Sequence, residues 1–111
     1  MLTLPSGLRV YIANQPLDMR KSFQGISALI QAQFNCAANG GHIFVFHNRG
    51  FDKIKIFYWD RNGFVQWYKQ LEQGRFRFPR LTQKLYEISA SDLTLLLEGI
   101  DLNYSQRLSA F

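Results

Sequence analysis

The chain has 111 residues, of which 47% are hydrophobic, 15% aromatic and 19% charged. This length suits one domain with its own core, and this apolar content excludes an intrinsically disordered chain. Lysine and arginine number 13 against 8 for aspartate and glutamate, and the single cysteine, Cys36, excludes an internal disulfide and a cysteine-based zinc site.

The chain shows no sign of a membrane segment or an export signal. No run approaches the roughly 18 apolar residues of a transmembrane helix, and the first residues lack the charged and apolar regions of a secretory signal. There is also no internal repeat, low-complexity tract or linker. We therefore expect residues 1–111 to form a single soluble domain in the cytoplasm, with no membrane partner.

Charge is distributed unevenly along the sequence. Residues 49–84 carry nine bases against three acids and hold nine of the seventeen aromatic residues. Residues 85–111 are acidic, with one base against four acids. A basic segment rich in aromatic residues attracts polyanions, nucleic acid among them.

The first half of the chain predicts a strand followed by an amphipathic helix. Leu8 to Ala13 reads as a short strand, and Asp18 is a favourable N-cap. Apolar residues then recur at helical spacing, which predicts a helix over 19–34. Arg20 and Lys21 would lie in its first turn, where free N–H groups favour binding of a phosphate or a partner's acid; a solvated pair beside the cap explains them equally well.

The second half predicts a series of strands joined by tight turns. Asn62-Gly63 is a strong hairpin signal, because these residues accept the positive φ that such turns need. The expected strands are His42 to His47, Lys53 to Trp59, Phe64 to Leu71, Arg75 to Phe78, and Lys84 to Ile88.

A second helix is predicted after these strands. Ser89 with Asp92 resembles a capping box, leucines follow at helical spacing, and Gly99 is placed to end the helix. The resulting fold class is α+β: a single antiparallel β-meander sheet of about five strands with two packed helices.

The central hairpin carries the strongest functional pattern. Alternation along the strands places Lys53, Lys55, Phe57 and Trp59 on one face with Phe64, Gln66, Tyr68 and Gln70. Cations beside aromatic rings suit a nucleic-acid surface, where lysine meets phosphate and rings stack on bases. The alternative is an ordinary half-buried core with lysines guarding a strand edge.

These considerations give two sets of candidate residues. The expected DNA contacts are Arg49, Lys53, Lys55, Trp59, Arg61, Tyr68, Arg75, Arg77 and Arg80. The expected partner-binding residues are Arg20, Lys21 and Phe64.

Catalytic and metal-binding patterns are weak. His42 and His47 lie five residues apart on one predicted strand and therefore face opposite sides. Asp52 and Asp60 flank one strand and would lie about 25 Å apart, too far to hold divalent ions together. No phosphate loop or nucleophile elbow is present. We expect no catalytic residues, metal, cofactor or small-molecule substrate.

The ordered set of motifs along the chain resembles a known family, the TnpB-type accessory proteins (second open reading frame products) of the insertion-sequence-66 class of bacterial mobile elements. The resemblance runs almost end to end. Its residues are Leu4 to Gly7, Asp18 to Gly25, Gly41 to Phe46, Asn48-Arg49, Asp52 to Ile56, Trp59-Asp60, Gly63-Phe64, Tyr68-Lys69, Leu71-Glu72, Gly74 to Phe76, and Leu96 to Asp101. The chain departs from the family at Phe78 and Leu102, where tryptophan is frequent, and at Gln70, where a base is common.

The resemblance implies a role in transposition beside a separate DDE-type transposase and a second small accessory protein. It implies no enzymatic activity and transfers no catalytic residue. Two hypotheses follow: an accessory protein that contacts DNA, mostly at phosphates, or an adaptor that binds the transposase without touching DNA. Exposure of Phe57, Trp59, Phe64 and Tyr68 bears on both, because a helix covering that face would make it core.

Overall fold

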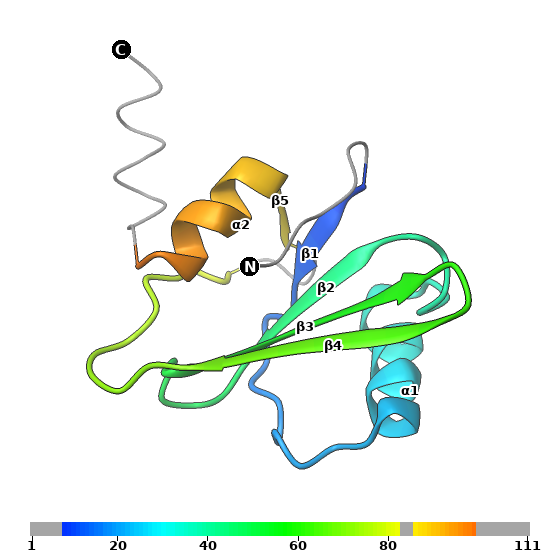
Figure 1. Cartoon of the computed structure of the whole chain (residues 1–111), viewed down its shortest axis with the longest axis horizontal. Helices are drawn as coiled ribbons and strands as arrows, with labels where there is room; N and C mark the ends of the chain where they lie inside the picture. Colours follow the sequence, from blue (N-terminus) through cyan, green and yellow to red (C-terminus); the bar gives the residue numbers. More distant parts are fainter. Residues whose placement is uncertain (1–7, 83–85, 100–111) are drawn as a thin grey trace.

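The protein is built on a five-stranded sheet with one helix on each face (Figure 1). The structure is a computed structural model that describes residues 8–82 and 86–99. In chain order the elements are β1 (Val10–Ile12), α1 (Phe23–Phe34), β2 (Ile43–His47), β3 (Lys53–Asp60), β4 (Gly63–Gln70), β5 (Tyr86–Ile88) and α2 (Ala90–Leu97). The strand order across the sheet is β4-β3-β2-β1-β5.

The sheet is mixed, so the prediction of a purely antiparallel sheet is wrong. Strands β2, β3 and β4 form the expected antiparallel meander. Strand β1 pairs parallel with β2 and antiparallel with β5. The reason is the crossover through α1: a helical connection returns the chain to the end of the sheet where β1 began, so that β2 runs in the same direction. The α+β class and the two helices are confirmed.

The two helices begin at serine caps. For α2, the hydroxyl of Ser89 accepts a hydrogen bond from the Asp92 N–H at 3.0 Å, as predicted. For α1 the predicted cap is wrong: Ser22, not Asp18, accepts from the Gly25 N–H at 3.2 Å. The helix therefore starts at Phe23, one turn later than expected. Both residues are good caps, so the sequence alone did not decide between them.

The segment from Arg75 to Phe78 alternates like a strand but does not pair as one. The Phe76 N–H donates to the Phe51 carbonyl at 2.7 Å, and Phe76 is 3% exposed. The alternation instead belongs to a loop in which the phenylalanines face inward and the arginines are exposed. The last predicted strand forms only at β5; residues 83–85, like Leu102, lie outside the described residues.

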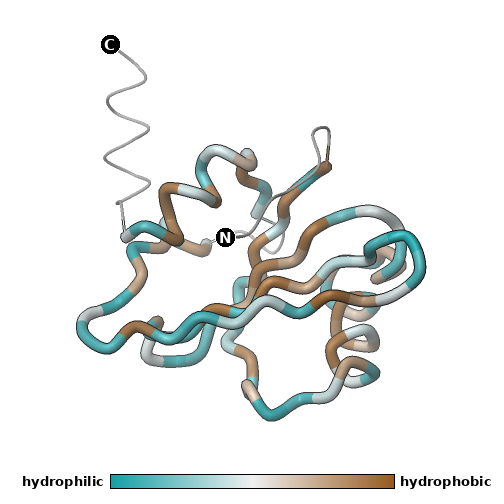
Figure 2. The backbone as a smooth tube through the Cα atoms, viewed as in Figure 1, coloured by the Kyte–Doolittle hydropathy of each residue, from teal (hydrophilic) through white to brown (hydrophobic). Residues whose placement is uncertain are grey.

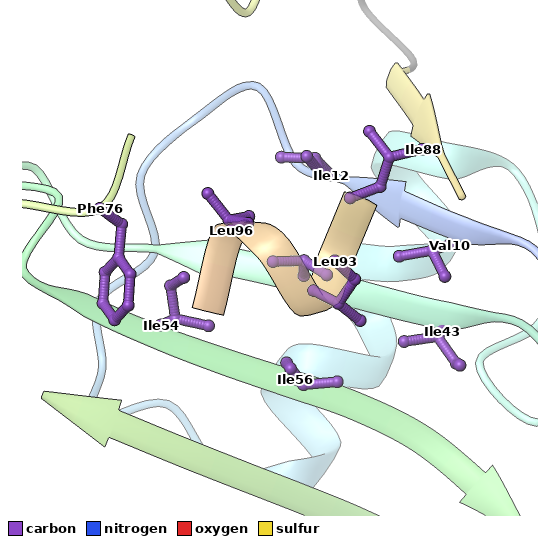
Figure 3. Close-up of a cluster of buried hydrophobic side chains, with 10 residues drawn as sticks. Val10, Ile12, Ile43, Ile54, Ile56, Phe76, Ile88, Leu93 and Leu96 are labelled. Atoms are coloured by element: carbon purple, nitrogen blue, oxygen red, sulfur yellow. The ribbon is translucent and has the colours of Figure 1, made fainter. Parts of the chain in front are cut away.

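Each face of the sheet has its own hydrophobic core. On one face Leu93 and Leu96 of α2 point onto the strands (Figure 3). That core contains Val10, Ile12, Ile43, Val45, Ile54, Ile56, Phe76, Ile88, Leu93 and Leu96. The opposite core, beneath α1, contains Ala13, Leu17, Ile26, Ile30, Phe34, Ala38, Phe44, Phe46 and Phe57. Hydrophilic residues gather in the loops at the two ends of the strands (Figure 2). Neither described helix is long and apolar enough to cross a membrane.

Truncation of Phe44 tests the core beneath α1. The ring is fully buried and lies 5.1 Å from the ring of Phe34, centroid to centroid. Phe44→Ala should lower the free energy of unfolding by about 3–5 kcal/mol, because the cavity it leaves is only partly refilled. Chemical denaturation measures this loss. Gln31→Ala, on the exposed side of the same helix, is the control and should change stability by less than about 0.5 kcal/mol; equal effects would contradict the packing described.

Candidate nucleic-acid interface

Basic side chains gather at the end of the sheet where β2 and β4 finish. The loop from Asn48 to Asp52 joins β2 to β3 there, and residues 71–82 follow β4 and pass beside it, on the left of Figure 1. The exposed or half-buried cations of this region form what we call the basic end: Lys21, Arg49, Lys53, Arg75, Arg77 and Arg80.

The loop that carries Arg49 is held by the side chain of Asn48. Its Oδ1 accepts hydrogen bonds from the backbone N–H groups of Asp52 and Lys53, both at 3.1 Å, and its Nδ2 donates to the Asp52 carboxylate. The Phe51 N–H donates to the Asn48 carbonyl at 3.2 Å, which closes the turn. Arg49 therefore projects from the tip of an ordered turn.

The segment that carries the other arginines is fixed by aromatic packing. His47 stacks on Phe51 with ring centroids 4.4 Å apart, and Phe78 meets His47 edge-on at 5.0 Å. The Leu71 N–H donates to the Asp52 carbonyl at 2.8 Å, where the segment leaves β4. Phe76 is buried and Phe78 half-buried, which leaves Arg75 and Arg77 exposed, and Arg80 is exposed after the buried Pro79.

Two hollows lie at the basic end. One, of about 500 Å³, is lined by Asn14, Phe51 and residues 75–81. The other, of about 600 Å³, brings Lys21 beside Arg49, with Asp18 also in its wall. Lys21 and Arg49 are far apart in sequence and line the same hollow because the loop after β1 passes the end of β2. Arginine forks around a hollow suit bidentate recognition of phosphate.

The cations of the basic end differ from every other cation of the described residues. Outside it, Arg9, Arg20 and Arg61 pair with the carboxylates of Glu87, Asp18 and Asp60 at 3.8, 2.9 and 3.6 Å. The remaining two, Lys55 and Lys69, donate to the carbonyls of Met19 and Leu97. Within residues 8–82 and 86–99, the basic end forms no ion pair, so its charge is available to an external anion.

Comparison with known proteins identifies the family. The profile of the IS66 Orf2 like proteins matches residues 8–107. The chain belongs to this family. It is an accessory protein family associated with insertion sequences and is not a known enzyme family.

Two curated relatives are similar over most of their length. The uncharacterized protein y4jC of Sinorhizobium fredii is 35% identical over 95 residues, covering 86% of this chain and 81% of the relative. The uncharacterized protein y4hO of the same strain is 34% identical over 105 residues, covering 93% and 91%. No solved structure matches the chain.

In this IS66 Orf2-like protein, the predicted DNA contacts fall into separate groups. Five belong to the basic end: Arg49, Lys53, Arg75, Arg77 and Arg80. Trp59 and Arg61 lie at the opposite tip of the β3–β4 hairpin, about 23 Å away along β3 at roughly 3.3 Å per residue. Tyr68 is 46% exposed and lies on β4 between the two ends.

Lys55 is the predicted contact that the structure removes from the surface. It is 4% exposed, its Nζ donates to the Met19 carbonyl, and it lies 5.3 Å from the ring centroid of Tyr68. Burial lowers the pKa of its ammonium group. The alternation along β3 was correct, but α1 and the loop before it cover this part of the face.

α1 and the loop before it also determine which aromatic residues of that face are exposed. Phe57 is fully buried, and Phe64 is half-buried against it with ring centroids 4.8 Å apart. Trp59 is half-buried with its edge toward Phe64. Only Tyr68, among the four aromatic residues proposed as a surface patch, is exposed. Of the predicted stacking face, Phe57 is therefore core, Phe64 packs against the core, and Trp59 is half-buried.

Arg20 and Lys21 precede α1 and are not in its first turn, which corrects the expected location. The Arg20 guanidinium donates to both carboxylate oxygens of Asp18, at 3.1 and 2.9 Å, and holds the pKa of that carboxyl well below its usual range. Arg20 is thus paired with Asp18, whereas Lys21 lines the same hollow as Arg49. No signal in the sequence indicated that Lys21 and Arg49 would line one hollow, because this depends on how the loop after β1 packs against the β2–β3 loop.

The pH dependence of stability should report on His47, beside the basic end. The ring is 2% exposed, with Nδ1 at 3.0 Å from the Asn48 carbonyl and Nε2 at 3.2 Å from that of Ala13. Burial lowers the pKa of His47 from its ordinary 6.5, and the two carbonyls offset this only in part. The unfolded chain takes up a proton before the folded one does, so the free energy of unfolding should fall as the pH drops below about 6.5.

Denaturation of the wild type and of His47→Gln between about pH 8 and pH 5 measures this effect. The variant lacks the titrating ring and should lose less stability over that interval, whatever its stability at pH 8. Parallel pH profiles for the two proteins would contradict the role assigned to His47.

Proposed function

We propose that this protein is a non-enzymatic accessory protein for transposition of an insertion sequence, and that it holds DNA by its phosphates through the basic end. The observation that carries the proposal is the contrast in pairing. All other cations of the described residues have a protein partner, while those of the basic end have no carboxylate partner there. The assisting role beside the transposase and the second accessory protein is supported by the family.

The elements that carry the cations determine how DNA would be read. Neither α1 nor α2 contains a lysine or arginine, so neither has the basic residues expected of a recognition helix in the major groove. Loop and strand-end cations make phosphate contacts, which position a protein on DNA without selecting a sequence. Choice of sequence would then belong to the transposase.

The second candidate is an adaptor that binds the transposase without contacting DNA. The observation that favours it is the pair of exposed large rings, Phe23 at 43% and Tyr68 at 46%. They are single residues beside half-buried neighbours, whereas the basic end gathers several charges that have no carboxylate partner among the described residues. We therefore place DNA contact first.

Removing charge at the basic end should change the salt dependence of DNA binding. The triple variant replaces Arg75, Arg77 and Arg80 with alanine. For each arginine that binds a phosphate, its removal should flatten the log–log dependence of affinity on salt by about one unit, with every DNA sequence affected alike. Titration of duplex DNA at several salt concentrations measures the slope. The matched control removes equal charge elsewhere, replacing Arg9, Arg20 and Arg61 with alanine, and should retain the wild-type slope.

Equal weakening in the two triple variants would show that only net charge matters. A folded Arg75, Arg77, Arg80 variant that binds DNA unchanged would remove the basic end from consideration and leave the adaptor role as the better account.

Two lysines on one strand give a sharper positional test. Lys53 is half-buried at the basic end, while Lys55 is buried and bound to Met19. Lys53→Met should weaken DNA binding and flatten the salt slope by about one unit. Lys55→Met removes the same charge two residues away and should leave the slope unchanged. The reverse pattern, measured by the same titration, would contradict the interface.

A further inference from the structure

Strand β4 forms one edge of the sheet, and its outer side has no partner strand among the described residues. All eight of its residues, Gly63–Gln70, pair with β3 in continuous register from Asp60↔Gly63 to Lys53↔Gln70. The strand is therefore long, regular and free of bulges, and it contains no proline. An exposed edge of this kind is a template for pairing with another strand.

The hairpin fixes which backbone groups face outward. Asp60 and Gly63 flank a two-residue turn, so they form a hydrogen-bonded pair and such pairs recur at every second residue. The hydrogen bond from the Leu71 N–H to the Asp52 carbonyl continues this series of alternate bonded pairs. The N–H and C=O groups of Phe64, Gln66, Tyr68 and Gln70 consequently point away from β3.

Within residues 8–82 and 86–99, β4 lacks the usual protection of a sheet edge. Natural edges are guarded by charges, prolines or bulges. The single charge on β4 is Lys69, and its Nζ donates to the Leu97 carbonyl at 3.0 Å, at the end of α2. That bond holds the ammonium group over the sheet face, where it does not obstruct the edge. Tyr68, meanwhile, is left 46% exposed.

We propose that β4 pairs with β4 of a second copy, antiparallel about a two-fold axis at Gln66, so that two sheets become one. In this register Phe64 lies opposite Tyr68 of the second copy, and Val65 lies opposite Trp67. Aromatic pairs and aromatic–β-branched pairs are favourable across antiparallel strands. Lys69 lies opposite Gly63, which has no side chain and no charge. The outward groups form about six main-chain hydrogen bonds.

Neighbouring registers are worse, which makes the pairing specific. An axis at Val65 places Lys69 opposite Arg61 of the second copy, and like charges directly opposite are destabilising. An axis at Trp67 places Lys69 opposite Val65 and separates the aromatic pair. Only the axis at Gln66 combines the Phe64–Tyr68 pair on one face with the Val65–Trp67 pair on the other and places no cation opposite Lys69. The strand is thus complementary to itself, which favours a second copy over an unrelated strand.

Sedimentation equilibrium of the full chain tests the oligomeric state. The wild type should show a concentration-dependent mass that rises from 13.0 kDa toward about twice that value. Gln66→Arg places two like charges face to face at the axis and should weaken dimerisation roughly tenfold. Gln70→Arg is the matched control. Residue 70 lies on the same face of β4 as residue 66, its backbone groups also point away from β3, and the added charge is the same, but the two copies of residue 70 lie far apart in the dimer. This variant should dimerise like the wild type.

Cross-linking tests the register in a Cys36→Ser background. Gln66→Cys should form a covalent dimer under mild oxidation, because the paired Cα atoms would lie about 5.5 Å apart, within disulfide range. Gln70→Cys should remain monomeric in a denaturing gel, because its two copies would be about 27 Å apart at roughly 3.4 Å per residue.

Several results would overturn the proposal: a wild type that stays monomeric at all concentrations, Gln70 variants that behave like the Gln66 variants, or a monomer whose edge captures a strand of the transposase instead. The proposal does not depend on DNA binding. The Arg75, Arg77, Arg80 variant should dimerise normally, so failure of the interface and failure of the dimer are distinguishable.

Discussion

Burial of β2 on both faces is the constraint on which the rest of the structure depends. All five of its residues, Ile43–His47, are buried, and the first four contribute in alternation to the two cores. A strand of this kind needs a cover on each side. The crossover helix α1 covers one face, and α2, following β5, covers the other. The loop after β1, the β2–β3 turn and the segment after β4 then meet at one end of the sheet, where the cations of the basic end lie.

The basic end is formed as a consequence of core packing. Phe76 packs in the core that contains Ile54, and Phe78 packs against Phe51 and the ring of His47. Arg75 and Arg77, on either side of Phe76, then face outward, while Pro79 after Phe78 is buried and Arg80 beyond it is exposed. These arginines are exposed without lying on a strand or helix, because an alternating loop segment with one side buried is sufficient. Core packing and exposed positive charge therefore share this segment, and His47 connects it to the sheet.

Local patterns in the sequence predicted local structure well. The Ser89 cap, the Gly99 helix end and the alternation of β3 and β4 all follow from interactions within a few residues. Two kinds of feature could not be predicted in this way. The parallel pairing of β1 and the burial of Lys55 depend on where α1 packs, and the alternation at Arg75 to Phe78 is equally compatible with a strand or an anchored loop. For the same reason, the sequence pattern indicated that Arg75 and Arg77 are exposed but did not indicate that Phe57 and Lys55 are buried.

Joining two copies at β4 would give the basic end a geometry that one copy lacks. In an antiparallel pair the end of one β4 lies beside the start of the other, so the two basic ends lie on opposite sides of the axis. The Gln70 residues alone would be about 27 Å apart, and the basic loops extend beyond them, toward the roughly 34–36 Å of one DNA turn. A two-fold arrangement would thus offer phosphate contacts on one side of a duplex at successive turns. Since each contact is weak and salt-dependent, two linked sets would bind far more tightly than either alone.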